Sequence, residues 1–218
     1  MYKLVIFDLD GTLVDSLTDL AIAVNQGLLK AGLSTHEVEA YKRFVGNGRD
    51  KLIDRAMGEA RDNTELRTIV KAEFDSYYAL HCNDNTRAYS GCAEMLRGLN
   101  DSGVMTAVLS NKPDEFVDEI LTRIYPEHQF TLAWGRKPIF TEKPNPESLH
   151  AMLSQLGVGR GECLYIGDSD VDVYTAKNAG VDMLGVSWGF RGAEELASAG
   201  APKVVDEANE ILEYVNEH

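Results

Sequence analysis

Two aspartates separated by one residue stand in the stretch FDLDGTLVDS, which directly follows the apolar run of residues 3–6. That run is typical of a buried strand. Side chains at positions i and i+2 of an extended chain project to the same side, so Asp8 and Asp10 are expected to share one small volume. Two carboxylates there repel each other. A hard cation with oxygen ligands or a shared proton would offset the repulsion, and both alternatives indicate chemistry.

An isolated D-x-D motif more often lies in a solvated loop. The residues at the other predicted strand ends therefore decide between a solvated loop and a functional site. LYIGDSDVD ends a strand with Asp168, and Asp172 follows one helical turn later. AVLSNK ends another with Ser110 and Asn111, a hydroxyl and backbone N–H groups suited to phosphate oxygens. EKPNPE places Lys143 before a proline and a helix. These groups are expected to converge at the carboxyl edge of a sheet, where open α/β sheets bind ligands.

A second basic pair, Arg136 and Lys137, precedes Lys143 in the same segment. Either position offers positive charge for a phosphate. We favour Lys143 because the Lys-Pro pair directly before a helix matches the expected position of the site.

The elements that must position these residues follow from the alternation along the chain. From residue 88 onward, short β-rich runs alternate with helical patterns, which predicts a mostly parallel sheet with helices on both faces. The strand-like runs are 3–7, 104–109, 130–133, 163–166, 183–186 and 203–205. The helical runs are 115–123, 146–156, 171–179, 193–199 and a last helix to residue 214. The predicted fold class is α/β, a Rossmann-like doubly wound parallel sheet.

Residues 15–85 have a different pattern, with helical periodicity and no convincing strand. Ser16 is a candidate N-cap with Asp19 three residues later. Two apolar stripes follow, which we interpret as core packing: Leu17, Leu20, Ala21, Val24 and Leu28, then Leu66, Ile69, Val70, Phe74 and Tyr77. We therefore predict a small helical domain, residues 15–85, inserted into an α/β catalytic core formed by residues 1–14 and 86–218.

Composition limits the classes of partner. The chain has 218 residues, 44% of them hydrophobic, and a formal net charge of -14, which disfavours nucleic acid and anionic membranes because both require clustered basic side chains. Its 3 cysteines show no C-x-x-C spacing, so neither a disulfide framework nor a thiolate metal site is indicated. We find no signal peptide pattern and no apolar run of membrane length. The expectation is a cytoplasmic protein, monomeric or homodimeric, without nucleic-acid or membrane partners.

In order along the chain, DLDGTLVDS, the strand-end Ser-Asn, the Lys-Pro and the G-D-S-x-x-D resemble the four motifs of the haloacid dehalogenase superfamily of phosphatases. The helical insertion resembles the small cap of one branch of that superfamily. Within this branch, FVGNGRDKLIDRAM (44–57) and VSWGF (186–190) are most similar to phosphoglycolate phosphatases. The resemblance implies a magnesium-dependent hydrolase of a small phosphorylated metabolite, best matched by 2-phosphoglycolate, that forms an aspartyl-phosphate.

The resemblance also implies a role for each motif residue. Asp8 would attack the phosphorus, and Asp10 would protonate the leaving oxygen and later deprotonate the attacking water. Ser110, the backbone of Asn111 and Lys143 would hold the phosphoryl oxygens.

The implied metal site has oxygen ligands only, which suits magnesium. Its ligands would be a carboxylate oxygen of Asp8, the backbone carbonyl of Asp10, and Asp168. Asp172 would lie behind these ligands and orient a bound water or the catalytic lysine, and Thr12 would shape the turn that fixes Asp10.

Residues of the insert are expected to recognise the leaving group. By the same resemblance Gly46, Asn47, Gly48 and Arg49 would face the site, where N–H groups or the Arg49 guanidinium could bind a small carboxylate. The alternative is an ordinary solvated arginine in the first turn of a helix.

Two other functions stay open from the motifs alone. A sugar phosphomutase of the same superfamily would use the same two aspartates. A non-enzymatic phosphoaspartate signalling module also combines a strand-end aspartate with a hydroxyl and a lysine, but it needs neither Asp10 nor an insert that covers the site.

Overall fold

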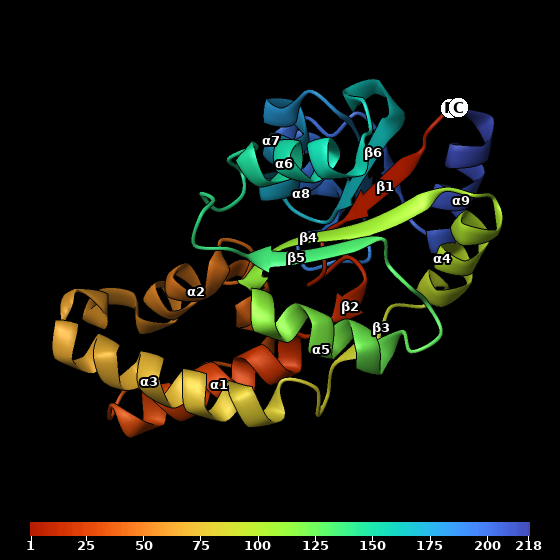
Figure 1. Cartoon of the computed structure of the whole chain (residues 1–218). Helices are drawn as coiled ribbons and strands as arrows, with labels where there is room; N and C mark the ends of the chain where they lie inside the picture. The colour runs from red at the N-terminus through yellow and green to blue at the C-terminus, as the bar shows by residue number, and fades with distance from the viewer.

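The computed structural model describes all 218 residues, and its centre is a sheet of six parallel strands in the order β5-β4-β1-β6-β7-β8 (Figure 1). The strands are β1 (Leu4–Phe7), β4 (Met105–Pro113), β5 (Leu132–Arg136), β6 (Cys163–Gly167), β7 (Asp182–Val186) and β8 (Val204–Val205). β1 lies between β4 and β6, with Phe7 opposite Val108 on one side and Ile166 on the other. The predicted α/β class is confirmed.

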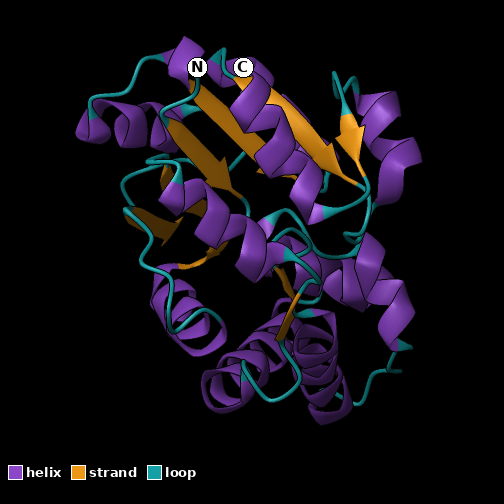
Figure 2. Cartoon of the chain, turned by 90° about the vertical axis from the view of Figure 1, so that its right-hand side faces the viewer, coloured by secondary structure: helices purple, strands orange, loops and turns teal.

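Helices cover both faces of the sheet because alternate side chains of β1 point in opposite directions (Figure 2). Val5 and Phe7 join a buried cluster with α4 (Cys92–Asp101), α5 (Asp114–Ile124) and α9 (Ala208–Glu217). Leu4 and Ile6 join the opposite cluster with α6 (Glu147–Leu156), α7 (Asp170–Ala179) and α8 (Gly192–Ala199). The strand order reverses beside β1, so the carboxyl ends of β1, β4 and β6 form the crevice where such sheets bind ligands.

Three helices form a separate layer below the sheet in Figure 1, and we call them the helical insert. They are α1 (Leu17–Lys30), α2 (Gly48–Met57) and α3 (Thr64–His81), with 3-10 turns at Val38–Arg43 and Gly58–Asp62. α1 packs tightly on α3, since a Cβ at Gly27 would lie 2.6 Å from the carbonyl oxygen of Val70. The first predicted stripe is fully buried; in the second, Tyr78 is buried instead of Tyr77.

The sequence analysis did not predict the two short strands at the base of the insert. β2 (Val14–Asp15) pairs antiparallel with β3 (Arg87–Ala88), although no strand was expected at residue 15. Two residues are too few to show a period of two. β4 also runs to Pro113, beyond the predicted end at residue 109, because it keeps pairing with β5 across an irregularity.

The N-terminus of α1 differs from the predicted capping arrangement. Ser16 occupies the N-cap position, but its hydroxyl donates to the carboxylate of Asp10 instead of capping the helix. Asp19 accepts hydrogen bonds from the backbone N–H groups of Asn85 at 3.0 Å and Thr86 at 2.8 Å, and from both of their side chains. Ser16 and Asp19 therefore pair with residues outside the first turn of α1. Asp19 anchors α1 to residues 85–86, where the chain returns from the insert to the core.

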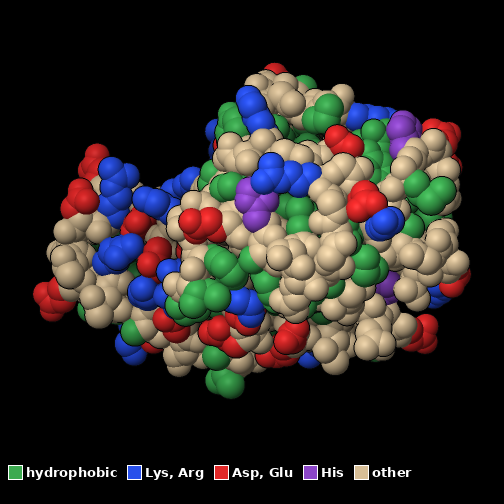
Figure 3. All heavy atoms as spheres, turned by 45° about the horizontal axis from the view of Figure 1, so that its top comes forward, with side chains coloured by type: hydrophobic (Ala, Val, Ile, Leu, Met, Phe, Trp, Pro, Cys, Tyr) green, Lys and Arg blue, Asp and Glu red, His purple; other side chains and the backbone are tan.

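The insert carries charges of both signs on its surface. The space-filling view shows Lys and Arg side chains among Asp and Glu on the protruding part at the left, which is the insert (Figure 3). None of the helices combines the length and the apolar character that crossing a membrane requires.

Replacing Asp19 by alanine is expected to lower the free energy of unfolding by about 2–4 kcal/mol, because the buried N–H and hydroxyl donors of Thr86 lose their acceptor and the hydrogen bonds from Asn85 are lost as well. Urea denaturation followed by circular dichroism measures the change. The matched control is Asp62→Ala at an exposed position of the insert, which should change stability by less than about 0.5 kcal/mol. Equal effects of the two substitutions would contradict the anchoring role of Asp19.

Candidate active site

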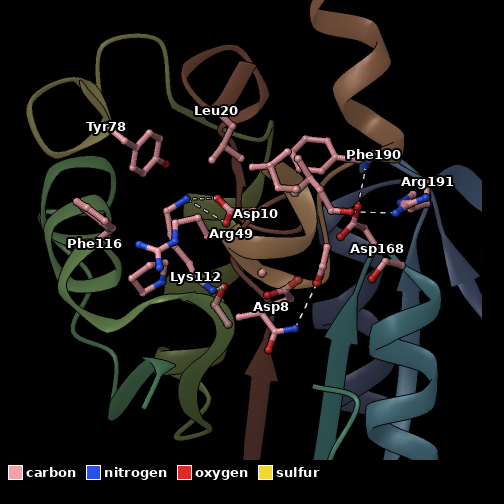
Figure 4. Close-up of a pocket in the computed structure, with 18 of the residues that line it drawn as sticks. Asp8, Asp10, Leu20, Arg49, Tyr78, Lys112, Phe116, Asp168, Phe190 and Arg191 are labelled. Atoms are coloured by element: carbon pink, nitrogen blue, oxygen red, sulfur yellow. Dashed lines mark hydrogen bonds and ion pairs between the residues drawn. The ribbon is translucent and has the colours of Figure 1, made fainter. Parts of the chain in front are cut away.

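The carboxyl ends of β1, β4 and β6 bring the predicted motif residues into one pocket (Figure 4). Asp8 directly follows β1, Ser110 and Asn111 lie in β4, and Asp168 directly follows β6. Asp10, two residues beyond Asp8, lines the same pocket. The convergence of side chains from strands far apart in the sequence is thus present in the structure, while the chemical role of each stays a prediction.

Lys143 reaches this group from the loop before α6. Its Nζ atom lies 2.9 Å from Asp8 Oδ1, 2.9 Å from Asp172 Oδ1 and 2.9 Å from the Tyr165 hydroxyl, and it is almost completely buried. Burial alone would lower the pKa of Lys143, but attraction to Asp172 and Asp8 outweighs it and holds the pKa well above its ordinary value. The lysine is therefore a permanent cation beside Asp8.

The alternative basic pair lies outside this group. Lys137 forms an ion pair with Asp114 at 2.7 Å, and Arg136 forms one with Glu142 at 2.8 Å. Neither side chain pairs with Asp8, whereas the Nζ atom of Lys143 lies 2.9 Å from its Oδ1 atom. The structure favours Lys143 over this pair.

Asn111 positions Lys143 and also contacts the insert. Its Oδ1 atom accepts from the backbone N–H of Lys143 at 2.8 Å, and its Nδ2 atom donates to the carbonyl of Lys143 at 3.1 Å and to that of Gly46 at 3.3 Å. The neighbouring Ser110 hydroxyl accepts from the backbone N–H of Lys112 at 3.2 Å. The sequence analysis considered only the backbone of Asn111, so this use of the side chain was missed.

Three buried carboxylates form the best candidate for a metal site. Oxygen atoms of Asp8, Asp168 and Asp172 all lie within 4.8 Å of one another. Burial, followed by repulsion from Asp172 and Asp8, raises the pKa of Asp168 well above its ordinary value. Burial and the other carboxylates also raise the pKa of Asp8 to about 7, although Lys143 opposes the shift. One ammonium group does not balance three carboxylates, so a hard divalent cation fits this site.

Within this cluster, Asp172 is already saturated by the protein. Its Oδ2 atom accepts from the backbone N–H and hydroxyl of Ser169, and its Oδ1 atom accepts from Tyr165 and Lys143. Asp8 uses Oδ1 for the backbone N–H of Leu9 and for Lys143. Asp172 therefore orients its neighbours, and the oxygen Oδ2 of Asp8 accepts no hydrogen bond from the protein.

The surroundings of Asp168 are shaped for a close approach. A Cβ atom at Gly11 or at Gly189 would lie 2.4 Å or 2.2 Å from atoms of Asp168, so only glycine fits at these two positions. The carboxylate accepts from the backbone N–H of Phe190 at 2.7 Å and, weakly, from the Thr12 hydroxyl at 3.4 Å. Thr12 thus supports Asp168 directly, in addition to its predicted place in the turn.

Lys112 is the main site residue that the sequence analysis missed. Its Nζ atom lies 2.9 Å and 3.0 Å from the two carboxylate oxygens of Asp10, and its side chain is buried. Attraction to Asp10 outweighs burial and raises the pKa of Lys112. Applying to Ser110 and Lys112 the same i, i+2 rule that linked the two aspartates would have found it. Asp10 therefore has its own lysine, separate from the one that serves Asp8.

The insert contributes the outer part of the pocket. Gly46, Gly48 and Arg49 line it, whereas Asn47 does not and instead accepts a hydrogen bond from an arginine of α2. The Arg49 guanidinium forms an ion pair with Asp75 of α3 at 2.7 Å. Arg49 lies in the first turn of α2, as predicted. It is paired with Asp75 and lines the pocket.

Apolar side chains from core and insert close the rest of the pocket. The pocket has an empty volume of about 660 Å³, part of it open to solvent. Its remaining walls include Leu20, Val45, Leu52, Phe74, Tyr78, Pro113, Phe116, Phe190 and Arg191. The pocket thus combines a few polar side chains with mostly apolar walls, an arrangement that suits a small-molecule substrate.

Without a metal, the raised pKa values of Asp8 and Asp168 make the protein less stable as pH rises. A carboxyl group with a higher pKa in the folded state favours folding when protonated, and the benefit is lost between its ordinary value of 3.8 and about 7 for Asp8. The melting temperature in chelator should therefore fall as the pH rises from about 4 to about 7, and magnesium should restore it more strongly at the higher pH. Differential scanning fluorimetry measures both effects.

Asp168→Asn is the test variant for this dependence, and Asp62→Asn on the exposed insert surface is its control. The first should reduce both the pH dependence and the effect of magnesium, and the second should leave them unchanged. A magnesium effect of the same size in Asp168→Asn would exclude Asp168 as a ligand.

Comparison with known proteins agrees with this geometry. The family model for haloacid dehalogenase-like hydrolases matches residues 5–186. A phosphoglycolate phosphatase of Vibrio parahaemolyticus is 34% identical over 98% of this chain and 96% of that protein, and one of Colwellia psychrerythraea is 35% identical over 96% and 95%. The crystal structure of a predicted phosphoglycolate phosphatase from Haemophilus somnus superposes with a TM-score of 0.90, 31% identity and coverage of 98% and 97%. The chain therefore belongs to the family of haloacid dehalogenase-like hydrolases.

Proposed function

We propose that this hydrolase is a magnesium-dependent phosphatase of a small phosphorylated metabolite, and that its substrate is 2-phosphoglycolate. The observation that carries the proposal is the division of charge at the strand ends. Asp8 and Asp10 line one pocket, and each contacts a different buried lysine, Lys143 and Lys112. Such separation suits two carboxylates with two different tasks.

Asp8 is the proposed nucleophile. One of its oxygens, Oδ1, accepts a hydrogen bond from the backbone N–H of Leu9 and lies 2.9 Å from the Nζ atom of Lys143, which fixes the direction of the carboxylate. Its other oxygen attacks the phosphorus, the bond from phosphorus to the ester oxygen breaks, and an aspartyl-phosphate forms. Water then attacks the same phosphorus, and the carboxylate of Asp8 leaves as phosphate is released.

Asp10 is the proposed proton carrier. It gives a proton to the ester oxygen as that oxygen leaves, and it takes a proton from the attacking water in the second step. Contacts with Ser16 and Lys112 hold its carboxylate at the pocket wall, two residues beyond the nucleophile. The geometry thus supplies one fixed carboxylate for each role.

The phosphoryl oxygens are held by groups around Asp8. We assign this task to Ser110, the backbone of Asn111 and Lys143, which gather at the ends of β4 and of the loop before α6. Magnesium on Asp8, Asp168 and the backbone carbonyl of Asp10 would supply positive charge to the phosphoryl group. Local cations matter here because the chain as a whole carries a net charge of -14.

The choice of substrate rests on relatives and on the pocket. The two curated relatives compared above are phosphoglycolate phosphatases, and each is aligned over almost its full length. The pocket extends from the aspartates between the core and the insert, with Gly46, Gly48 and Arg49 along its outer wall. We propose that residues 15–85 act as a cap that covers the substrate, over a catalytic core of residues 1–14 and 86–218.

Phosphate release from a panel of small phosphate esters and sugar phosphates, with magnesium and with chelator, tests the proposed function. We expect metal-dependent release that is strongest for 2-phosphoglycolate. Transfer of the phosphoryl group to a sugar, without release, would replace the phosphatase by a phosphomutase. A single turnover that stops at a stable phosphoprotein would instead indicate a signalling module.

Substitutions of the two aspartates separate their roles. Asp8→Asn should abolish turnover, because the amide cannot form the acyl phosphate. Asp10→Asn should lower kcat about 10² to 10⁴-fold, the usual contribution of a general acid and base. Near-normal turnover by Asp8→Asn would exclude the covalent mechanism, and Asp15→Asn, at the exposed neighbouring aspartate, serves as the control for both.

A further inference from the structure

The hydroxyl of Tyr78 is a buried polar group for whose O–H the chain provides no acceptor. Tyr78 lies in α3, is 1% exposed, and its O–H donates to no acceptor within the protein. Its ring lines the pocket, and the close-up shows the hydroxyl directed toward Lys112 (Figure 4). A buried O–H without an acceptor is unfavourable, so a ligand that accepts from it gains affinity.

Lys112 is the cation next to this hydroxyl. Its Nζ atom lies 5.0 Å from the centre of the Tyr78 ring and contacts both oxygens of Asp10. Asp10 must touch the ester oxygen in order to protonate it, so Lys112 lies beside the leaving group. Lys143 instead contacts Asp8, on the side of the transferred phosphoryl group. The two lysines thus serve the two ends of the substrate.

We propose that Lys112 and Tyr78 together bind a carboxylate that the leaving group carries on the carbon next to its ester oxygen, an assignment that rests on the phosphatase function proposed above. Such a carboxylate is two covalent bonds from the ester oxygen, which places it within the short reach that separates Asp10 from Lys112. One carboxylate oxygen accepts from the Lys112 ammonium group and the other accepts from the Tyr78 hydroxyl.

The walls of this subsite strengthen the interaction. Leu20, Phe74 and Phe116 line the same pocket, and they keep the local polarity low. A leaving group with a carboxylate also places a second negative charge beside Asp10, and Lys112 offsets that repulsion. Substrates without the carboxylate leave the hydroxyl of Tyr78 unpaired, so the site discriminates against them.

Arg49 is the competing cation for the same carboxylate. It lines the pocket, but its guanidinium pairs with Asp75 and Asp50 of the insert and makes no contact with either catalytic aspartate. Lys112 contacts Asp10 directly. The carboxylate subsite therefore combines Lys112 of the core with Tyr78 of the insert, and it is complete only when the insert lies against the core.

The test compares 2-phosphoglycolate with ethyl phosphate, in which a methyl group replaces the carboxylate. Tyr78→Phe keeps the ring and removes only the unpaired hydroxyl, so the melting temperature should be unchanged or higher. Its kcat/KM should fall about 10- to 100-fold for 2-phosphoglycolate, the range expected for a hydrogen bond to a charged group, and stay within about twofold for ethyl phosphate.

Tyr41→Phe is the matched control, because Tyr41 is a buried tyrosine of the insert whose hydroxyl donates to Asn25 at 2.6 Å and which does not line the pocket. It should affect both substrates equally. Lys112→Met should lower turnover of both substrates, since Asp10 loses its partner, and it should lower that of 2-phosphoglycolate more.

Each remaining outcome overturns the assignment in a recognisable way. Equal losses for the two substrates in Tyr78→Phe would give the hydroxyl a general role only. A selective loss in Arg49→Ala with none in Tyr78→Phe would move the carboxylate to Arg49. Absence of phosphate release from both esters by the wild type would reject the phosphatase function, and with it the subsite.

Discussion

The contact of Lys143 with Asp8 and Asp172 is the interaction on which the candidate active site of this protein depends. Buried carboxylates without a counter-charge are costly, and three of them lie within 4.8 Å of one another here. The lysine ammonium group reduces that cost, and Tyr165 and Asn111 fix its position from β6 and β4. The remaining excess of negative charge makes this cluster the candidate metal site.

Parallel strands make this crowding possible. Each of β1, β4 and β6 buries its apolar residues in the sheet and ends in a polar group at the same edge. The packing of the two faces fixes the strands, so the polar groups have little freedom to move apart. Packing of the core therefore holds together carboxylates that repel one another, and such strain is common at functional sites.

Much of this arrangement could be predicted from the sequence, because it follows from patterns of short range. The continuous apolar run of residues 4–7, the alternation of β-rich and helical patterns after residue 88, and the polar residues directly after the strands identified the sheet and its functional edge. The resemblance to the haloacid dehalogenase superfamily predicted the family that the comparisons confirmed.

Contacts between distant parts of the chain set the limit of such prediction. Ser16 had the type and position of a helix cap, yet Asp10 competes successfully for its hydroxyl. Tyr77 and Tyr78 fit a helical stripe almost equally well, and only packing against the core selects Tyr78. Lys112 in isolation is an ordinary strand-end lysine, and its importance depends on the approach of Asp10 from the loop after β1.

The short ribbon of β2 and β3 has a consequence for how such a protein can diversify. The two strands pair side by side, so the chain leaves the core and returns to it at one place. Because both ends of the insert meet at this ribbon, the insert is in effect one closed loop attached to the core. The entropic cost of closing such a loop grows only slowly with its length. New helices can therefore be exchanged beside an unchanged sheet edge, so the recognition proposed for the insert and the chemistry proposed for the sheet edge can evolve separately.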